Sequence, residues 1–98
     1  MTIEIKKNSK EIIIELVGRL DTITAPVLEQ TVNENLDGIE NLVLDLKGIE
    51  YVSSAGLRVL LASQKKIQKV GSMKLINVCE NVMEIFEMTG FSDILTIE

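Results

Sequence analysis

The sequence contains no histidine and no tryptophan, a single proline, Pro26, and a single cysteine, Cys79. Without histidine neither a Ser-His-Asp nor a Cys-His catalytic arrangement can form, and the commonest metal ligand is missing. A lone cysteine cannot form an internal disulfide, which is typical of reducing compartments. We therefore expect a cytoplasmic protein that is not an enzyme and that holds neither a metal nor a cofactor.

Long apolar runs and excess positive charge are also missing. No apolar run is longer than about five residues, against the roughly 20 that span a bilayer. The N-terminus lacks the basic start and apolar stretch of a signal peptide. With 15 acidic and 10 basic residues the net charge is −5, so little is available to neutralise nucleic-acid phosphates. Neither a membrane nor a nucleic acid is expected as a partner.

The 98 residues that are present have the composition of an ordinary globular domain, 46% hydrophobic and 26% charged. This is too apolar for a disordered chain. The length leaves no room for a second core. A single domain over residues 1–98 is expected.

Apolar periodicity divides the chain into strands and helices that alternate after an N-terminal pair of strands. Two β-rich runs separated by three turn-forming residues predict an antiparallel hairpin. The alternation that follows predicts parallel pairing with right-handed crossovers. We therefore expect an α/β fold with a mixed, mostly parallel sheet of about five strands and about three helices. Strands are predicted at residues 2–7, 11–17, 41–46, 73–78 and 91–97, and helices at about 25–37, 54–70 and 80–88.

The first helix is expected to be capped by Thr22 or Thr24, with Pro26 in its first turn, where the lost N–H costs nothing. Asp21 precedes this cap, and either a loop-ordering role or a role in binding remains open. Gly48 is expected to form a turn after the strand at residues 41–46. Parallel sheets place ligand sites at the carboxyl ends of their strands. Asp21, Asp45, Ser53, Ser54 and Asn77 are therefore predicted to share one face.

The small residues from Ser53 to Gly56 lie between a predicted buried strand and a predicted helix. Backbone N–H groups are unpaired at such a helix start, and the helix dipole favours negative charge there. The residues alone leave two interpretations open, a helix cap without chemistry and an exposed functional hydroxyl. The aliphatic and aromatic side chains of the last helix, Met83, Phe86 and Met88, are expected in the core or in an apolar partner patch.

Four segments, GRLDTITA, LVLDLKGIEYVSSAGLRVLL, MKLINV and IFEMTGF, occur in this order along nearly the whole chain. Together they resemble the STAS family, specifically the bacterial anti-sigma factor antagonists. The resemblance implies a small mixed sheet with helices. It also implies partners: an anti-sigma factor that is a serine kinase, which the unphosphorylated form captures so that the sigma factor is freed, and a phosphatase that resets the phosphorylated form. A monomer or weak dimer is expected.

The family's phosphoacceptor lies in an Asp-Ser-x-Gly-Leu pattern, which Ser54–Leu57 matches and which implies phosphorylation of Ser54. Ser53 replaces the usual aspartate and is an alternative acceptor. Asp21 matches a family aspartate implicated in kinase contact. Gly56 is expected to pack closely, and Arg58 faces either a partner or solvent. The implied partner-binding residues are Asp21, Thr22, Thr24, Ser53, Ser54, Ala55, Gly56, Leu57, Arg58 and Asn77.

Two other functions remain as alternatives. The first is a STAS subunit that regulates or supports a transporter or a stress-signalling assembly without a phosphorylation switch. The second is a small enzyme that uses Ser54 or carboxylates, which the missing histidines disfavour.

Overall fold

The strands of the central sheet lie in the order in which they occur in the chain. The computed structural model describes residues 1–98 and forms one four-stranded sheet, β1-β2-β3-β4. β1 pairs with β2 antiparallel, and β2–β3 and β3–β4 are parallel. The predicted α/β fold with an N-terminal hairpin is therefore confirmed. The elements are β1 (Thr2–Lys7), β2 (Glu11–Leu20), α1 (Ala25–Asn35), β3 (Asn41–Val52), α2 (Ser54–Ile67), β4 (Ser72–Ile76), α3 (Glu80–Thr89) and the 3₁₀ helix η1 (Phe91–Asp93).

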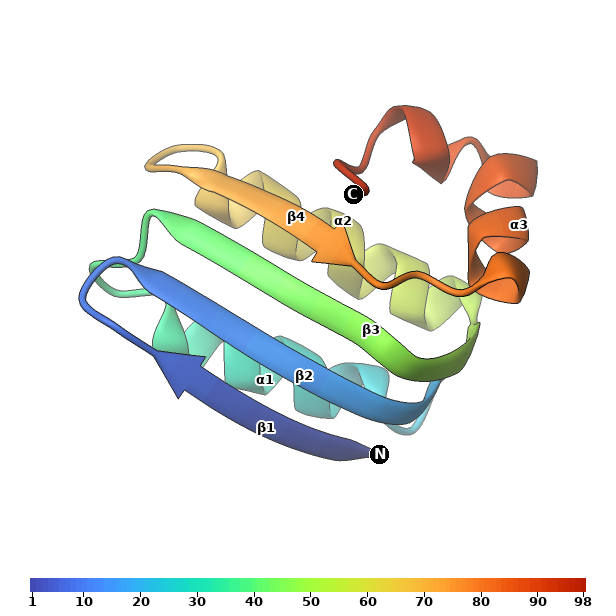
Figure 1. The fold of residues 1–98 in the computed structure, drawn as a ribbon, viewed down its shortest axis with the longest axis horizontal. Helices are drawn as coiled ribbons and strands as arrows, with labels where there is room; N and C mark the ends of the chain where they lie inside the picture. The colour runs from blue at the N-terminus through green and yellow to red at the C-terminus, as the bar shows by residue number, and fades with distance from the viewer.

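Two helices, α1 and α2, cover one face of the sheet, and α3 lies beyond the end of β4 (Figure 1). Alternate strand residues point to the covered face, because the side-chain period of a strand is two. These residues form one core with the helices, and fully burying an aliphatic side chain of this kind contributes about 1.5–3 kcal/mol. The core includes Ile12, Ile14 and Leu16 of β2, Leu42, Leu44 and Leu46 of β3, Leu28 and Val32 of α1, Leu57, Leu60 and Ile67 of α2, and Phe86 of α3.

The prediction of a turn at Gly48 is wrong, because β3 continues through it to Val52 and β2 continues to Leu20. The pairing register shifts between Glu15 and Val17 and again between Gly18 and Arg19, so the ladder bends at bulges instead of ending. Gly48 permits this close approach, since a Cβ there would lie 2.7 Å from Cγ2 of Val17. Both central strands are consequently longer than predicted and end side by side.

The predicted C-terminal strand is also wrong. Gly90 ends α3 with φ 81°, and η1 follows at once. Only Ile97 pairs with the sheet, through a single parallel bridge to Leu75. Leu75 donates to the carbonyl of Thr96 at 2.9 Å and accepts from Glu98 at 2.9 Å. Of the apolar residues in this segment, Leu95 is buried in the core and Phe91 and Ile97 pack against it, whereas Ile94 is exposed.

Two further boundaries differ from the prediction. Helix α2 ends at Ile67, before the predicted residue 70, and β4 ends at Ile76. Asn77 has φ 56°, a left-handed conformation that a strand cannot contain. It therefore turns the chain out of the sheet toward α3.

Candidate functional site

Ser53 caps α2. It has extended backbone angles, and its Oγ accepts a hydrogen bond from the N–H of Gly56 at 3.3 Å. Its own N–H donates to the carbonyl of Leu20 at 2.8 Å, and its carbonyl accepts from Leu57 at 2.9 Å. The Ser53 side chain is half-buried. The helix-cap interpretation therefore holds for this serine.

Ser54 is the first residue of α2 and is exposed. Its hydroxyl has no hydrogen-bond partner in the chain, and the N–H groups of Ser54 and Ala55 are also unpaired. A negative charge added here would meet the positive end of the helix dipole, an interaction worth about 0.3–1 kcal/mol. The structure thus separates the two serines that the sequence names as first and alternative acceptor: the hydroxyl of Ser53 is used as a helix cap, and that of Ser54 is free.

Gly56 brings the start of α2 against the ends of β2 and β3. It is buried, and a Cβ at this position would lie 2.8 Å from the Leu20 carbonyl oxygen and 2.9 Å from Cγ1 of Val52. Real Cβ atoms do not approach other atoms so closely, so only glycine fits without displacement. The close-packing role expected for Gly56 is confirmed.

We expect Gly56→Ala to lower the free energy of unfolding by about 1–3 kcal/mol, because the added methyl group overpacks a contact with backbone. Urea unfolding followed by circular dichroism measures the change. Ser54→Ala is the control, since an exposed substitution on the same turn should stay within about 0.5 kcal/mol. Equal stabilities for Gly56→Ala and Ser54→Ala would contradict the packing described.

Asp21 orders the loop that joins β2 to α1. Its Oδ1 accepts from the N–H groups of Ile23 at 3.0 Å and Thr24 at 3.1 Å. Thr24 is at the N-cap position, but its hydroxyl points back, donating to the Arg19 carbonyl at 2.6 Å and accepting from the N–H of Asp21 at 2.9 Å. The predicted side-chain cap from Thr22 or Thr24 is therefore wrong. Pro26 lies in the first turn of α1 as expected.

The hydrogen bond from the Thr24 N–H, assisted by that from Ile23, holds the pKa of Asp21 below its ordinary value. A carboxylate with a lowered pKa in the folded state stabilises the fold above its unfolded pKa and loses this contribution as pH falls through the folded value. We expect the stability advantage of the wild type over Asp21→Asn to be largest above about pH 5 and to shrink below about pH 4. Urea unfolding at a series of pH values from above about pH 5 to below about pH 4 measures this advantage. A difference that does not vary with pH would contradict the role of charge.

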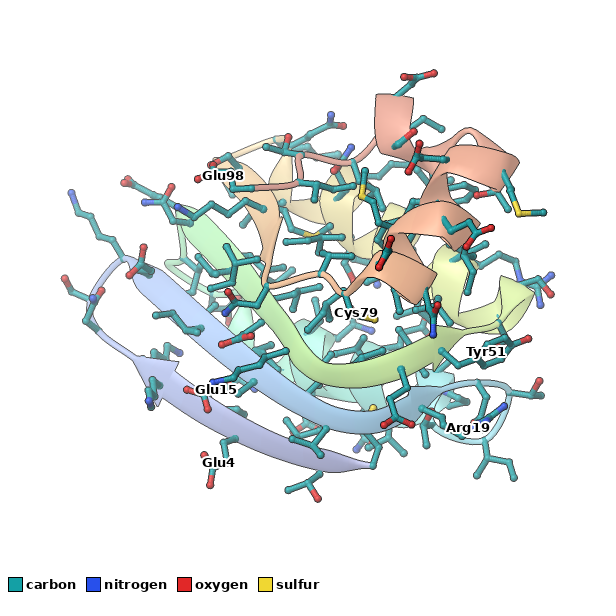
Figure 2. All side chains as sticks on the ribbon, turned by 45° about the vertical axis from the view of Figure 1, so that its right-hand side comes forward. Glu4, Glu15, Arg19, Tyr51, Cys79 and Glu98 are labelled. Carbon is teal, nitrogen blue, oxygen red and sulfur yellow. The ribbon has the colours of Figure 1, made fainter.

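The extended ends of β2 and β3 carry an aromatic–cation contact next to this loop. Arg19 lies over the ring of Tyr51, with its guanidinium carbon 4.7 Å from the ring centroid. Figure 2 shows both side chains at the same end of the sheet. Sequence reasoning missed this contact, because Arg19 and Tyr51 become neighbours only through the shifted register.

A groove of about 350 Å³ lies between α1 and α2. Glu29 lines it from α1 and Arg58 from α2, and neither forms a salt bridge within the chain. Of the predicted partner-binding residues, Thr22, Ala55 and Arg58 line it. The sequence did not indicate the other lining residues, since their exposure depends on how the two helices pack. These are Ala25, Pro26, Glu29, Val59 and Ala62.

Other predicted residues lie elsewhere or are covered. Asp45 is inside β3 and not at its end, and its Oδ1 accepts from the Asn77 side-chain amide at 3.1 Å. The prediction that Asp45 ends its strand beside the serines is therefore wrong. Leu57 is only 6% exposed and packs in the core.

Helix α3 divides its apolar residues between core and surface. Phe86 is fully buried and Met83 is packed against the core, but Met88 is 80% exposed. Cys79 is half-buried, with Sγ 3.4 Å from the Ile49 carbonyl oxygen. No three metal-ligating side chains converge. None of the helices combines the length and apolarity that a membrane crossing requires.

Comparison with known proteins shows which family this chain belongs to. The model of the STAS domain matches residues 2–98. The anti-sigma-B factor antagonist of Bacillus subtilis (strain 168) is 32% identical over 98 residues, which cover 99% of this chain and 90% of that protein. The crystal structure of an anti-sigma factor antagonist from Mycobacterium paratuberculosis has a TM-score of 0.87 at 25% identity, covering 98% of this chain and 83% of that one.

A third relative shares the fold alone. SpoIIAA, an anti-sigma factor antagonist and Bacillus cell fate determinant, has a TM-score of 0.84 in its unphosphorylated form, at 14% identity over 99% of this chain and 88% of that one. Its phosphorylated form has a TM-score of 0.76, at 14% identity over 99% and 91% of the two chains. With the family model matching almost every residue, this chain belongs to the STAS domain family.

Proposed function

We propose that the protein is an anti-sigma factor antagonist. Its unphosphorylated form binds an anti-sigma factor with serine kinase activity, and phosphorylation of Ser54 reverses the binding. The observation that carries this proposal is the free, exposed hydroxyl of Ser54 beside a serine already used as a cap. The names of the relatives supply the class of partner.

The proposed partner-binding surface consists of Ser54, the Asp21 loop and the groove between α1 and α2. The exposed side chain of Ile23 stands in that loop, 82% accessible. Arg58 and Glu29 bring opposite charges that have no salt-bridge partner within the chain. Charges of this kind orient a partner and set its register more than they add affinity.

Phosphorylation changes the charge at Ser54 by about −1.5 to −2 at neutral pH. Against a partner carboxylate at ~5 Å, the repulsion at an effective dielectric near 20 is about 3 kcal/mol per unit charge before screening. A loss of about 3 kcal/mol is more than a hundredfold in affinity. At the helix N-terminus itself the charge is tolerated, so binding is reversed without unfolding of the domain.

The first test is the position of the phosphate. Incubation with the partner kinase and ATP should add one phosphate to the wild type and to Ser53→Ala, and none to Ser54→Ala, as read by mass spectrometry. Ser53→Ala removes a helix cap worth about 1 kcal/mol, so its folding is checked by circular dichroism. Phosphate on Ser53 would contradict the choice of acceptor. A protein that binds its partner but accepts no phosphate would act instead as a module of a larger assembly without a switch.

The second test separates charge from shape. Ser54→Asp and Ser54→Asn introduce side chains of nearly equal size, but only the aspartate is charged. The partner measured is the anti-sigma factor that the unphosphorylated form binds. We expect Ser54→Asp to weaken this binding about a hundredfold, because one added unit charge costs about 3 kcal/mol, and Ser54→Asn to weaken it much less. Isothermal titration calorimetry measures both. Equal affinities for the two variants would contradict the electrostatic mechanism.

The third test locates the surface. Ile23 and Met88 are apolar side chains of nearly equal exposure, 82% and 80%. Ile23→Asp should weaken partner binding about tenfold or more, since it places a charge in the proposed interface. Met88→Asp, on α3, is the matched control and should bind as the wild type does. A larger loss for Met88→Asp would move the interface to α3.

A further inference from the structure

The outer edge of β1 is unpaired. β1 is the first strand of the sheet order and pairs only with β2, whereas the opposite edge is partly closed by the bridge between Leu75 and Ile97. Figure 1 shows no element beyond β1. An edge of this kind presents a row of unpaired N–H and C=O groups to any strand that fits.

The side chains of β1 alternate between the two faces of the sheet. Ile3 and Ile5 point toward the helices, and Ile5 is still 43% exposed because no helix reaches over the edge. Glu4 and Lys6 point to the opposite face, which no helix covers. This follows from the pairing of Glu4 with Glu15, which alternates with buried residues of β2.

The charges on this open face are unevenly matched. Lys6 Nζ lies 2.8 Å from Oε1 of Glu15, and this contact raises the pKa of Lys6. Glu4 lies directly across from Glu15, a like charge, and has no salt-bridge partner of its own. Like charges in direct opposition destabilise a strand pair. A positively charged side chain of a binding partner, placed beside Glu4, would therefore offset the repulsion between Glu4 and Glu15.

We propose that the partner of this edge is a second copy of the same chain. Two β1 strands pair antiparallel about a two-fold axis at Ile5, which joins two sheets of four strands into one of eight. Glu4 of each copy then faces Lys6 of the other, and the two exposed Ile5 side chains face each other. The pairing forms an isologous interface, in which each contact occurs twice.

Only the register with its two-fold axis at Ile5 places residues of opposite charge across from each other. Because alternate residues point to opposite faces, the axis must pass through a residue that faces its own counterpart. An axis at Glu4 or at Lys6 would place like charges in opposition. An axis at Ile3 would leave Lys6 and Lys7 beyond the end of the paired segment. Charged edge strands resist pairing with other strands, but the sequence from Glu4 to Lys6 is complementary to itself.

The interface is small, since β1 has six residues. The surface area that such a strand pair buries lies below the ~1,200 Å² typical of stable complexes. We therefore expect association at concentrations on the order of 0.1–1 mM. None of the residues involved belongs to the proposed partner-binding surface. This inference therefore stands or fails independently of the proposed function.

The test is a charge swap. Sedimentation equilibrium measures the dissociation constant, and a dilution series of ¹H–¹⁵N spectra identifies the amides that move with concentration. Glu4→Lys and Lys6→Glu alone each place like charges in opposition twice across the axis, and each should weaken association about tenfold or more. The double variant Glu4→Lys/Lys6→Glu restores opposite charges across the axis and places a lysine opposite Glu15, so association should return.

Glu87→Lys and Lys69→Glu are the matched controls, because they make the same charge changes at exposed positions on α3 and after α2. They should associate as the wild type does, and circular dichroism confirms that all variants fold. The proposal is overturned by amides of β1 that do not shift up to about 2 mM, by concentration-dependent shifts confined to another surface, or by a double variant that remains as weak as the single ones.

Discussion

The contact between the first turn of α2 and the ends of β2 and β3 is the constraint on which the site depends. Gly56 leaves room for no Cβ against Leu20 and Val52, and the Ser53 N–H is bonded to the Leu20 carbonyl. Ser53 also caps the helix, because its Oγ accepts from the N–H of Gly56. The position of Ser53 is therefore fixed by both its backbone and its side chain. The hydroxyl of Ser54 is consequently held outward on a rigid support.

This arrangement is compatible with the proposed phosphorylation of Ser54, which would require no change of fold. The segment before Ser54 is fixed by the sheet, and the segment after it continues into a helix whose inner face is core. A phosphate added at this point displaces no buried group and breaks no hydrogen bond within the chain. Its effect is therefore confined to what approaches from outside, which suits a protein whose output is binding.

Much of this fold could be predicted from the sequence, because the central strands β2 and β3 are rich in apolar residues that the buried face of the sheet requires. Two of the wrong predictions have separate physical causes. Gly48 predicts a turn, because glycine is common in turns, but in the structure it allows two strands to approach within a bulged ladder. The apolar residues after Gly90 predict a strand, since their pattern alone does not distinguish a strand from a 3₁₀ turn followed by a segment that packs on the core.

The site was predictable only in its position. That a serine cluster stands between strand and helix follows from the order of small and apolar residues, but which serine caps the helix depends on backbone angles, extended at Ser53 and helical at Ser54. The groove depends on the packing of α1 against α2, so the position of Glu29 in its lining could not be predicted from the sequence. For Asp21 the sequence leaves two roles open, ordering the loop and binding a partner. The structure demonstrates the loop-ordering role.

The chemistry of the proposed switch also follows from hydrogen-bonding capacity. A free serine hydroxyl that finds no acceptor in its own chain can donate to an acceptor on the partner, and the oxygen that removes its proton during phosphoryl transfer is such an acceptor. Phosphorylation replaces this donor with oxygens that mostly accept at neutral pH, because the second pKa of the phosphate is about 6. In the proposed complex the phosphate oxygens would then meet the acceptor that the serine hydroxyl would otherwise bind. The sign of the interaction reverses whatever the local dielectric is, and the dielectric decides only its size.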